Sequence, residues 1–377
     1  MKSQENLLIV AGSEHDANML YAVRMFVPDP FIWLRLRGRD FIAVHDLEID
    51  RARVQAAHCR VLSTVQLQKK LRAAGYPRPG YAEIIRHLLR ERGIRRVLVP
   101  ENFPLGLATQ LAKLNIKTVV KPGAFFPERE IKTPAELRHI RAALAMAETG
   151  MAAGIAALRA AKIGANRRLM YQGAALTSER LRAVIDTAIT QLGGLPANTI
   201  VAGGIQGCDP HERGHGPLRA HEPIILDIFP RAQATGYFGD ITRTVVKGRA
   251  SEAVRKLYAT VEASQEVAYR KMRAGTPTID VHHAVVNFFA QQGYKTGKRN
   301  GHMEGFFHGT GHALGLEIHE SPRMGATSVG ELVAGQVLTN EPGLYYPGIG
   351  GVRIEDVAVI TSGRPRCLTR FEKVLEV

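Results

Sequence analysis

The chain has 377 residues, of which 45% are hydrophobic and 23% are charged, together with 37 glycines and 19 prolines. This balance excludes the disordered, collagenous and coiled-coil classes, and a length above about 250–300 residues predicts two domains. Cys59, Cys208 and Cys367 lie far apart without a CxxC pair, which excludes a disulfide framework and a thiolate zinc site and favours a reducing cytoplasm. No apolar run reaches the roughly 18–20 residues of a membrane span, and none near the first residue is long enough for a signal peptide. We therefore expect a cytoplasmic protein with no membrane partner.

The net charge of +15 and the pI near 9.9 suggest nucleic acid as a possible partner. The basic residues are dispersed, however, and in the Ala-rich stretch 138–161 they punctuate a helical pattern. A dispersed excess is typical of a solvated surface rather than of a phosphate-binding track, and no nucleic-acid motif accompanies it. We therefore expect no nucleic-acid partner.

Residues 1–127 are predicted to form the first domain. Short apolar runs between Leu7 and Val120 alternate with amphipathic stretches such as 81–93 and 104–115. Strands interleaved with helices of 10–15 residues predict an α/β layer domain. The stretch 121–129 breaks every periodic pattern, which places the domain boundary at residue 127.

Residues 128–377 are predicted to form an α+β domain. Thr133, Pro134 and Glu136 combine a capping box with proline at the first helical position, which predicts a helix start. The helical pattern continues to about Leu192. Strand patterns at 199–204, 223–229 and 240–246, two further helices at 251–293 and a Gly- and Pro-rich segment with short β-type runs at 301–360 then follow in order. Helices and strands segregated in this way, with several hairpins, are typical of an α+β domain.

Two predicted hairpins each contain a pair of carboxylates. Asp227 and Asp240 lie 13 residues apart in apolar strand patterns, and Glu341 and Glu355 lie 14 residues apart around a Gly-rich turn. The two hairpins could converge on one point, but four carboxylates share a pocket only with cations, because like charges a few Å apart would force protonation. Two divalent metal ions resolve this conflict, since carboxylates that bridge two metals can clamp a water and a scissile carbonyl.

A histidine-rich segment, 308–320, completes this pattern. It holds His308, His312 and His319 at intervals of four and seven residues, with glycines that allow close approach of the backbone. His312 would add one nitrogen ligand to the carboxylates. A second window holds His211, His215 and His221.

Five segments resemble, in order and spacing, the metal-binding motifs of the Xaa-Pro peptidases, that is aminopeptidase P and prolidase. They are PIILDIFP at 223–230, GYFGDITRT at 236–244, HGTGHALGLEIHE at 308–320, NEPGLYYPG at 340–348 and GGVRIEDV at 350–357. The resemblance extends from about Thr133 to Val377, and residues 1–127 resemble the creatinase-type N-terminal domain that accompanies this family. It implies an α/β N-terminal domain followed by an α+β pita-bread (creatinase/aminopeptidase-like) catalytic domain.

The resemblance also implies the ligands and the metals. The five ligands would be Asp227, Asp240, His312, Glu341 and Glu355, with Asp240 and Glu355 bridging. They would hold two divalent metal ions per chain, with Mn expected and Co or Zn as alternatives, because carboxylate and imidazole ligands accept several first-row ions.

The remaining roles follow from the same resemblance. Glu341 would double as general base, and His319 with His211 would hydrogen-bond the scissile carbonyl and the tetrahedral intermediate. His308 and Arg353 would line the substrate site. The sequence offers both His211 and His215 where the family has one histidine; the Pro-His context favours His211.

The expected activity is hydrolysis of the bond between an N-terminal residue and a following proline, by an Xaa-Pro aminopeptidase or Xaa-Pro dipeptidase. The partners would be a peptide with proline at the second position and a second copy of the chain, since relatives are commonly homodimers. One alternative is a methionine aminopeptidase, which has the same ligand types and fold but usually no separate α/β domain of this size. The other is a catalytically silent pita-bread module used for binding.

Overall fold

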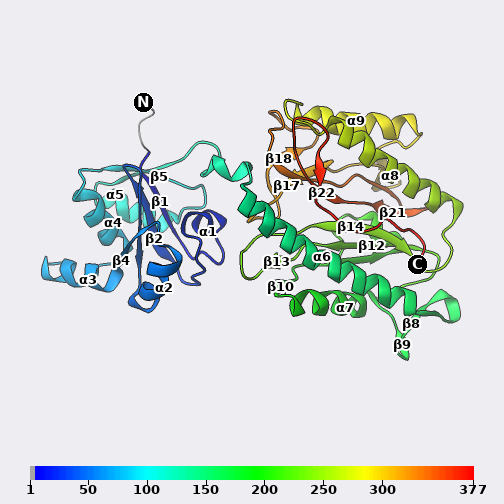
Figure 1. Cartoon of the computed structure of the whole chain (residues 1–377), viewed down its shortest axis with the longest axis horizontal. Helices are drawn as coiled ribbons and strands as arrows, with labels where there is room; N and C mark the ends of the chain where they lie inside the picture. Colours follow the sequence, from blue (N-terminus) through cyan, green and yellow to red (C-terminus); the bar gives the residue numbers. More distant parts are fainter. Residues whose placement is uncertain (1–4) are drawn as a thin grey trace. The chain divides into compact units, whose positions relative to one another are not determined.

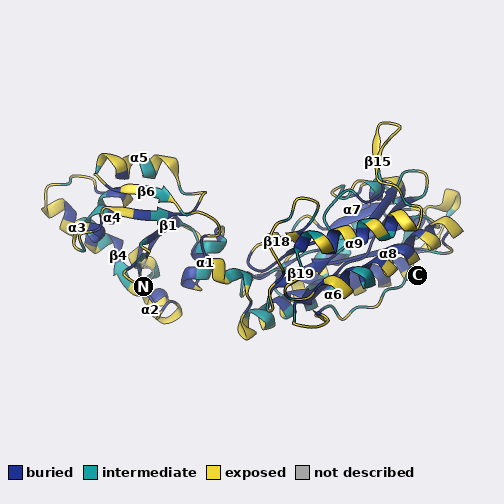
Figure 2. Ribbon diagram, turned by 90° about the horizontal axis from the view of Figure 1, so that it is seen from above, coloured by how far each residue is buried: buried dark blue, intermediate teal, exposed yellow. Residues whose placement is uncertain are grey.

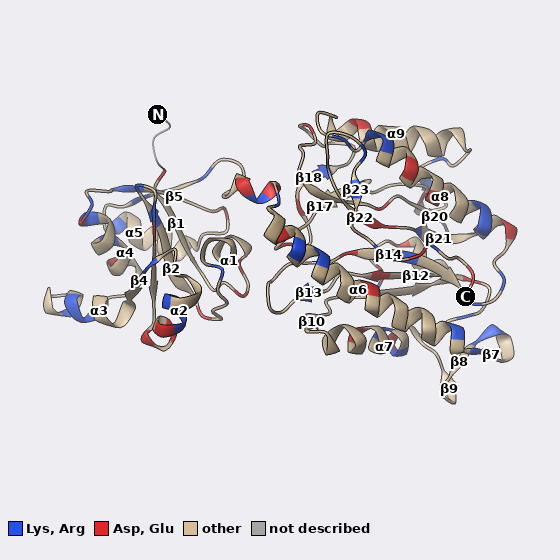
Figure 3. Ribbon diagram, viewed as in Figure 1, with Lys and Arg blue, Asp and Glu red and all other residues tan. Residues whose placement is uncertain are grey.

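The computed structural model describes residues 5–377, which divide into two compact units (Figure 1). The first unit ends at Pro127 and the second comprises Glu128–Val377. Within the described residues, no helix has both the length and the apolar content that a membrane crossing requires. Lys and Arg are distributed along the elements of both units (Figure 3).

The first unit is a mixed six-stranded sheet with the strand order β4-β3-β2-β1-β5-β6. Pairs β1/β2 and β2/β3 are antiparallel, whereas β3/β4, β1/β5 and β5/β6 are parallel. The strands are β1 Leu7–Ala11, β2 Phe31–Leu36, β3 Arg39–Val44, β4 Arg60–Ser63, β5 Arg96–Val99 and β6 Lys117–Val120. The helices are α1 Ala17–Val23, α2 Ile49–Gln55, α3 Thr64–Ala73, α4 Tyr81–Arg90 and α5 Leu105–Lys113.

Helices cover both faces of this sheet because its central strands are apolar on both sides. Successive side chains of a strand point to opposite faces. Leu8 and Val10 of β1 therefore join the core that includes residues of α3, α4 and α5, while Leu7 and Ile9 join the core that includes residues of α1 and α2. The prediction of an α/β layer domain is confirmed.

The second unit surrounds its strands with four long helices: α6 Pro134–Ala160, α7 Ser178–Gln191, α8 Glu252–Lys271 and α9 Thr278–Gln291. The capping box predicted at the start of α6 is present, with the Thr133 N–H donating to Glu136 Oε2 at 2.9 Å and the Glu136 N–H donating to Thr133 Oγ1 at 3.3 Å. Each of the four helices buries one face, and Figure 2 shows buried strands beneath the exposed outer faces of α6, α8 and α9.

The strands of this unit form several small sheets. The three that matter for the site are β11-β12-β14, β18-β17-β19-β22-β23 and the hairpin β20-β21; the others are β10-β13, β15-β16 and β7-β8-β9. The bounds are β7 Lys162–Ile163, β8 Leu169–Tyr171, β9 Ala174–Ala175, β10 Gly194–Leu195, β11 Ile200–Gly203, β12 Pro223–Ile228, β13 Arg231–Ala232, β14 Ile241–Val246, β15 Gly297–Arg299, β16 His302–Glu304, β17 Gly311–Ala313, β18 Glu320–Met324, β19 Val337–Asn340, β20 Gly343–Tyr346, β21 Gly350–Arg353, β22 Asp356–Val359 and β23 Arg366–Cys367.

One stretch departs from the prediction. The helical pattern was expected to run to about Leu192, but residues 162–175 form the small sheet β7-β8-β9 between α6 and α7. The loop between β8 and β9 is Gln172–Gly173, and φ is positive at both residues, 50° and 77°. Two consecutive positive φ values are those of a type I′ turn, which joins antiparallel strands and cannot continue a helix.

Candidate metal centre

The four predicted carboxylates lie at or beside strand ends of two neighbouring sheets. Asp227 lies in β12 and Asp240 directly precedes β14, which pairs antiparallel with β12. Glu341 follows β19, and Glu355 precedes β22. These two strands pair antiparallel, with Asn340 of β19 opposite Asp356 of β22. The Glu355 N–H donates to the Thr242 carbonyl at 3.0 Å and so joins the two sheets beside the acids. The two hairpins therefore converge.

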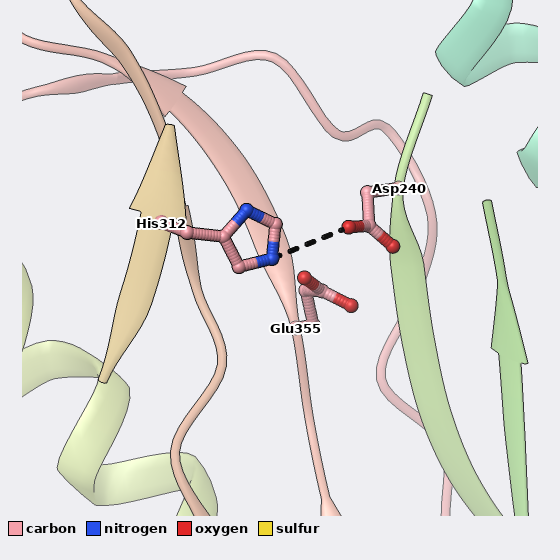
Figure 4. Close-up of side chains that lie close together, drawn as sticks. All are labelled: Asp240, His312 and Glu355. Carbon is pink, nitrogen blue, oxygen red and sulfur yellow. Dashed lines mark ion pairs between the residues drawn. The ribbon is translucent and has the colours of Figure 1, made fainter. Parts of the chain in front are cut away.

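Three of the five predicted ligands lie together in a buried cluster. One ligand atom from each of Asp240, His312 and Glu355 lies within 4.8 Å of the others (Figure 4). His312 Nε2 is 3.8 Å from Asp240 Oδ2 and 3.3 Å from Glu341 Oε1, so Glu341 borders the same cluster. All of these side chains are at most 18% exposed.

Asp227, the fifth predicted ligand, is held by an arginine. Arg353 Nη2 donates to Asp227 Oδ2 at 2.7 Å, and both side chains are shielded from solvent. Burial raises the pKa values of Asp240, Glu341 and Glu355, and the charge of Asp227 adds a smaller contribution to each, so its carboxylate lies near the same group of acids.

Two glycines let the backbone bring the ligands in. A Cβ on Gly239, the residue before Asp240, would overlap the backbone of Ala143 and Leu144 in α6. A Cβ on Gly311, the residue before His312, would overlap the carbonyl of Thr339 in β19. Only glycine permits such close approach, so Gly239 and Gly311 allow the backbone beside Asp240 and His312 to pack directly against α6 and β19.

Two threonines that sequence reasoning missed hold the carboxylates. Thr242 Oγ1 donates to Glu355 Oε2 at 2.8 Å, and Thr339 Oγ1 lies 3.2 Å from Glu341 Oε1 and accepts from the His312 N–H at 3.0 Å. Thr242 and Thr339 each lie two positions from a ligand, Asp240 and Glu341. This period-2 spacing is the sequence signal that could have indicated them.

The side chains present fit a cation. Glu355 Oε1 is buried and has no hydrogen-bond partner among the described residues, whereas Oε2 is bonded to Thr242. A buried carboxylate oxygen without a partner is costly. Carboxylate oxygens and an imidazole nitrogen at mutual distances below 4.8 Å form a donor set that first-row divalent metals accept.

Burial shifts the acid–base behaviour of the metal-free centre. Burial, reinforced by the neighbouring acids, raises the pKa values of Asp240 and Glu355 well above the ordinary range. Burial raises the pKa of Glu341 to about 7, against the opposing charge of Arg353. Burial lowers the pKa of His312 to about 4. The metal-free centre therefore retains protons on its acids, and metal binding would release them.

These shifts predict how metal-free protein responds to pH. A carboxyl whose pKa is raised in the folded state contributes stability that is lost as the pH rises through that value. The lowered pKa values of His308 and His312 act in the opposite direction, but only below the ordinary value of 6.5. Between pH 6.5 and 8 the carboxyl groups determine how stability depends on pH, so the metal-free protein should lose stability as the pH rises.

Thermal unfolding in EDTA and in excess Mn²⁺ checks this prediction. The difference between the two melting temperatures should widen from pH 6.5 to pH 8, because metal binding replaces the protons that the acids lose. A constant difference across this range would contradict the assignment of Asp240, Glu341 and Glu355 to the metal centre.

A hydrogen-bonded chain runs from Asp227 to His308. Arg353 Nη2 donates to Asp227, and Arg353 Nη1 donates to the Tyr345 hydroxyl at 2.9 Å. The same hydroxyl lies 2.8 Å from His308 Nε2. Tyr345 is fully buried and was missed by the sequence reasoning, because nothing in its local pattern indicates a partner 37 residues upstream.

This chain fixes the protonation of His308. Arginine can only donate, so the Tyr345 oxygen accepts from Arg353; because a neutral imidazole with its hydrogen on Nδ1 has an acceptor at Nε2, the Tyr345 hydroxyl donates to His308 Nε2. Nδ1 of His308 lies 2.8 Å from the Gly309 carbonyl and therefore carries the ring hydrogen. Burial, reinforced by the charge of Arg353, lowers the pKa of His308 to about 3. His308 is thus a neutral, oriented ring that is suited to shaping the site.

The other predicted histidines differ in their surroundings. The His319 ring lies edge-on to His312, with ring centroids 4.4 Å apart. His211 is exposed, and it lies near enough to His308, His319 and Glu341 to interact electrostatically with all three. His215 instead contacts Gln206 and Glu212. These contacts favour His211 over His215 as the histidine that faces the centre.

Residues 138–362 match the model of metallopeptidase family M24. Among curated relatives, the chain is 30% identical over 289 residues to an Xaa-Pro dipeptidase of Pyrococcus horikoshii, covering 75% of each chain. It is also 30% identical over 248 residues to an uncharacterized peptidase of Staphylococcus aureus, covering 65% of this chain and 64% of that relative.

Solved structures share the fold across both units. An X-Pro aminopeptidase from Thermotoga maritima aligns with a TM-score of 0.82 at 20% identity, covering 99% of this chain and 97% of that one. A prolidase from Pyrococcus horikoshii aligns with a TM-score of 0.80 at 25% identity, covering 99% and 96%. The expected fold, an α/β domain followed by a pita-bread domain, is confirmed.

Proposed function

This chain belongs to metallopeptidase family M24, and on that premise we propose that it is a dinuclear metallopeptidase that hydrolyses the bond between an N-terminal residue and a following proline. The observation that carries the proposal is the buried cluster of Asp240, His312 and Glu355, with Glu341 3.3 Å from His312. The relatives named as Xaa-Pro dipeptidase, X-Pro aminopeptidase and prolidase support the choice of substrate.

Membership of a metallopeptidase family implies a divalent metal, and we propose that Asp227, Asp240, His312, Glu341 and Glu355 hold two ions, with Asp240 and Glu355 shared between them. The partnerless Glu355 Oε1 supports a bridging role for that residue. When bound, such ions act as Lewis acids that polarise a carbonyl and make water nucleophilic near neutral pH. Mn is the proposed metal, with Co and Zn as alternatives.

Glu341 is the general base in this proposal. Its carboxylate is buried and accepts a hydrogen bond from Thr339 Oγ1 at 3.2 Å, so it can take a proton from the attacking water at a fixed position. His319 and His211 flank the centre and can donate ring N–H groups to the oxygen of the scissile carbonyl as negative charge develops on it. His308, held by Tyr345, shapes the neighbouring wall.

Proline at the second position of the substrate suits this arrangement. Proline lacks an amide hydrogen, so a peptidase that grips the scissile N–H cannot position it. A site that holds the amino end of the substrate at the carboxylates, and surrounds the pyrrolidine ring with side chains such as His308 and Arg353, does not need that hydrogen.

Paired substrates test the proposed activity. Protein loaded with Mn²⁺ should hydrolyse Ala-Pro and Leu-Pro peptides, and should cut Ala-Ala and Met-Ala peptides of equal length far more slowly. Dipeptides and longer Xaa-Pro peptides assayed together separate a dipeptidase from an aminopeptidase. Preferential cleavage of Met-Ala would replace the Xaa-Pro assignment with a methionine aminopeptidase.

We also propose a homodimer and a cytoplasmic location. A two-fold dimer is the commonest symmetric assembly, and light scattering at micromolar concentration should give about twice the chain mass of 41.3 kDa. A mass near that of one chain would contradict the dimer. Cys59, Cys208 and Cys367 are free thiols, as is usual in a reducing compartment.

A further inference from the structure

Arg243 lies directly behind the candidate metal centre. It is in β14, one residue after Thr242 and three after Asp240, and it is only 1% exposed to solvent. A buried guanidinium must have acceptors for its N–H groups, because each unpaired one would be costly. The acceptors of Arg243 therefore show what the side chain holds in place.

The guanidinium meets five acceptors from three parts of the chain. Nη1 donates to the carbonyls of Thr242 at 2.9 Å and Glu355 at 2.6 Å. Nη2 donates to Asp356 Oδ1 at 2.8 Å and to the Phe371 carbonyl at 2.8 Å. Nε donates to the Glu372 carbonyl at 3.0 Å. Five acceptors match the five N–H donors of an arginine, so the side chain has one fixed position.

This position determines the backbone of Glu355. The Glu355 N–H donates to the Thr242 carbonyl at 3.0 Å, and the Glu355 carbonyl accepts from Arg243. The Glu355 side chain in turn accepts from Thr242 Oγ1 at 2.8 Å. Both peptide groups of Glu355 and one carboxylate oxygen are thus tied to the pair Thr242 and Arg243, which leaves Oε1 directed into the cluster without a partner.

Arg243 does not neutralise the charge of the ligand carboxylates. Its ionic partner is Asp356, which is also paired with Lys373 Nζ at 2.9 Å. The arginine that pairs with a predicted ligand carboxylate is Arg353, whose Nη2 donates to Asp227 Oδ2 at 2.7 Å. The contacts of Arg243 with the centre are hydrogen bonds to backbone carbonyls, which act through geometry.

We propose that Arg243 is a positioning residue for the metal centre, which fixes Glu355 and the start of β14 in the geometry that binds metal. The inference rests on the proposed function, because it assigns a role to a residue that contacts the backbone of the ligand Glu355 and the supporting residue Thr242, but no ligand carboxylate. Groups that orient metal ligands from outside the coordination sphere change metal affinity by about 10–100-fold when they are altered.

Metal affinity measured by competition with a chelator tests the inference. Arg243→Lys keeps a positive charge beside Asp356 but has one nitrogen where arginine has three, so it cannot reach acceptors from all three parts of the chain. Its affinity for Mn²⁺ should be about 10–100-fold weaker than that of the wild type. Arg180→Lys is the matched control, because Arg180 also donates to two carbonyls, those of Ala175 and Tyr171, but contacts no part of the centre. It should bind Mn²⁺ as the wild type does.

A second variant separates geometry from charge pairing. Arg243→Met combined with Asp356→Asn removes both charges, so no uncompensated charge of this pair stays buried, but the Glu355 and Thr242 carbonyls still lose their donor. Weak Mn²⁺ binding in this double variant, with circular dichroism like that of the wild type, supports a positioning role. Wild-type affinity in either Arg243 variant would overturn this inference alone. A wild-type protein that bound no Mn²⁺ would overturn the proposed function and this inference with it.

Discussion

Replacing Asp240 with asparagine is expected to abolish metal binding while the protein keeps its fold. A shared ligand needs anionic oxygens on both sides of the carboxylate, and an amide offers a single neutral acceptor. Affinity for Mn²⁺ should fall by more than about 100-fold, beyond the loss caused by altering outer groups, and hydrolysis should fall with it. Chelator competition and the rate with an Ala-Pro peptide measure both.

The same variant should be more stable than the wild type when both are metal-free. Burial and the charges of Glu355 and Asp227 raise the pKa of Asp240, which means that an ionised Asp240 opposes folding. A neutral asparagine removes that charge, so its melting temperature in EDTA at pH 8 should be higher. His283→Ala, at an exposed position of α9, should change neither metal binding nor activity. Full activity in Asp240→Asn would refute its role as a ligand.

Glu341→Gln should lower the turnover rate by about 10²–10⁴-fold at saturating metal, the range that a general base contributes. Glutamine has nearly the same shape and can still accept the hydrogen bond from Thr339, but it cannot take a proton from water. The acidic limb of the pH–rate profile, which reports the ionisation of the base, should be lost in this variant. Glu331→Gln, at an exposed position, is the control. A Glu341→Gln enzyme with more than about a tenth of the wild-type turnover would exclude Glu341 as the base.

The ligand pattern could be predicted from the sequence because its elements are local. Asp227 with Asp240, and Glu341 with Glu355, each belong to one hairpin, and acids in apolar strand patterns stand out without any knowledge of the fold. The capping box at Thr133 is equally local, since its two residues are three positions apart. The charge argument made a meeting of the two hairpins possible, and the resemblance to the Xaa-Pro peptidases implied the five ligands; the structure brings Asp240, His312 and Glu355 together.

The supporting residues could not be predicted, because their partners are distant in the sequence. Arg243 contacts Glu355 and Phe371 more than one hundred residues downstream, and Tyr345 contacts His308, 37 residues upstream. Nothing in the composition of a strand indicates which buried polar residue faces which carbonyl. The sheet at 162–175 was missed for a different reason: the helical patterns before and after it were joined across the turn at Gln172 and Gly173.

Five side chains of this chain are proposed to hold a pair of divalent metal ions. Anomalous diffraction at the manganese absorption edge, from crystals grown with Mn²⁺, tests it most directly. We expect two peaks per chain about 3.5–4 Å apart, the spacing of two-metal hydrolases, surrounded by Asp227, Asp240, His312, Glu341 and Glu355. No peak at this cluster, or manganese bound only elsewhere on the chain, would contradict it.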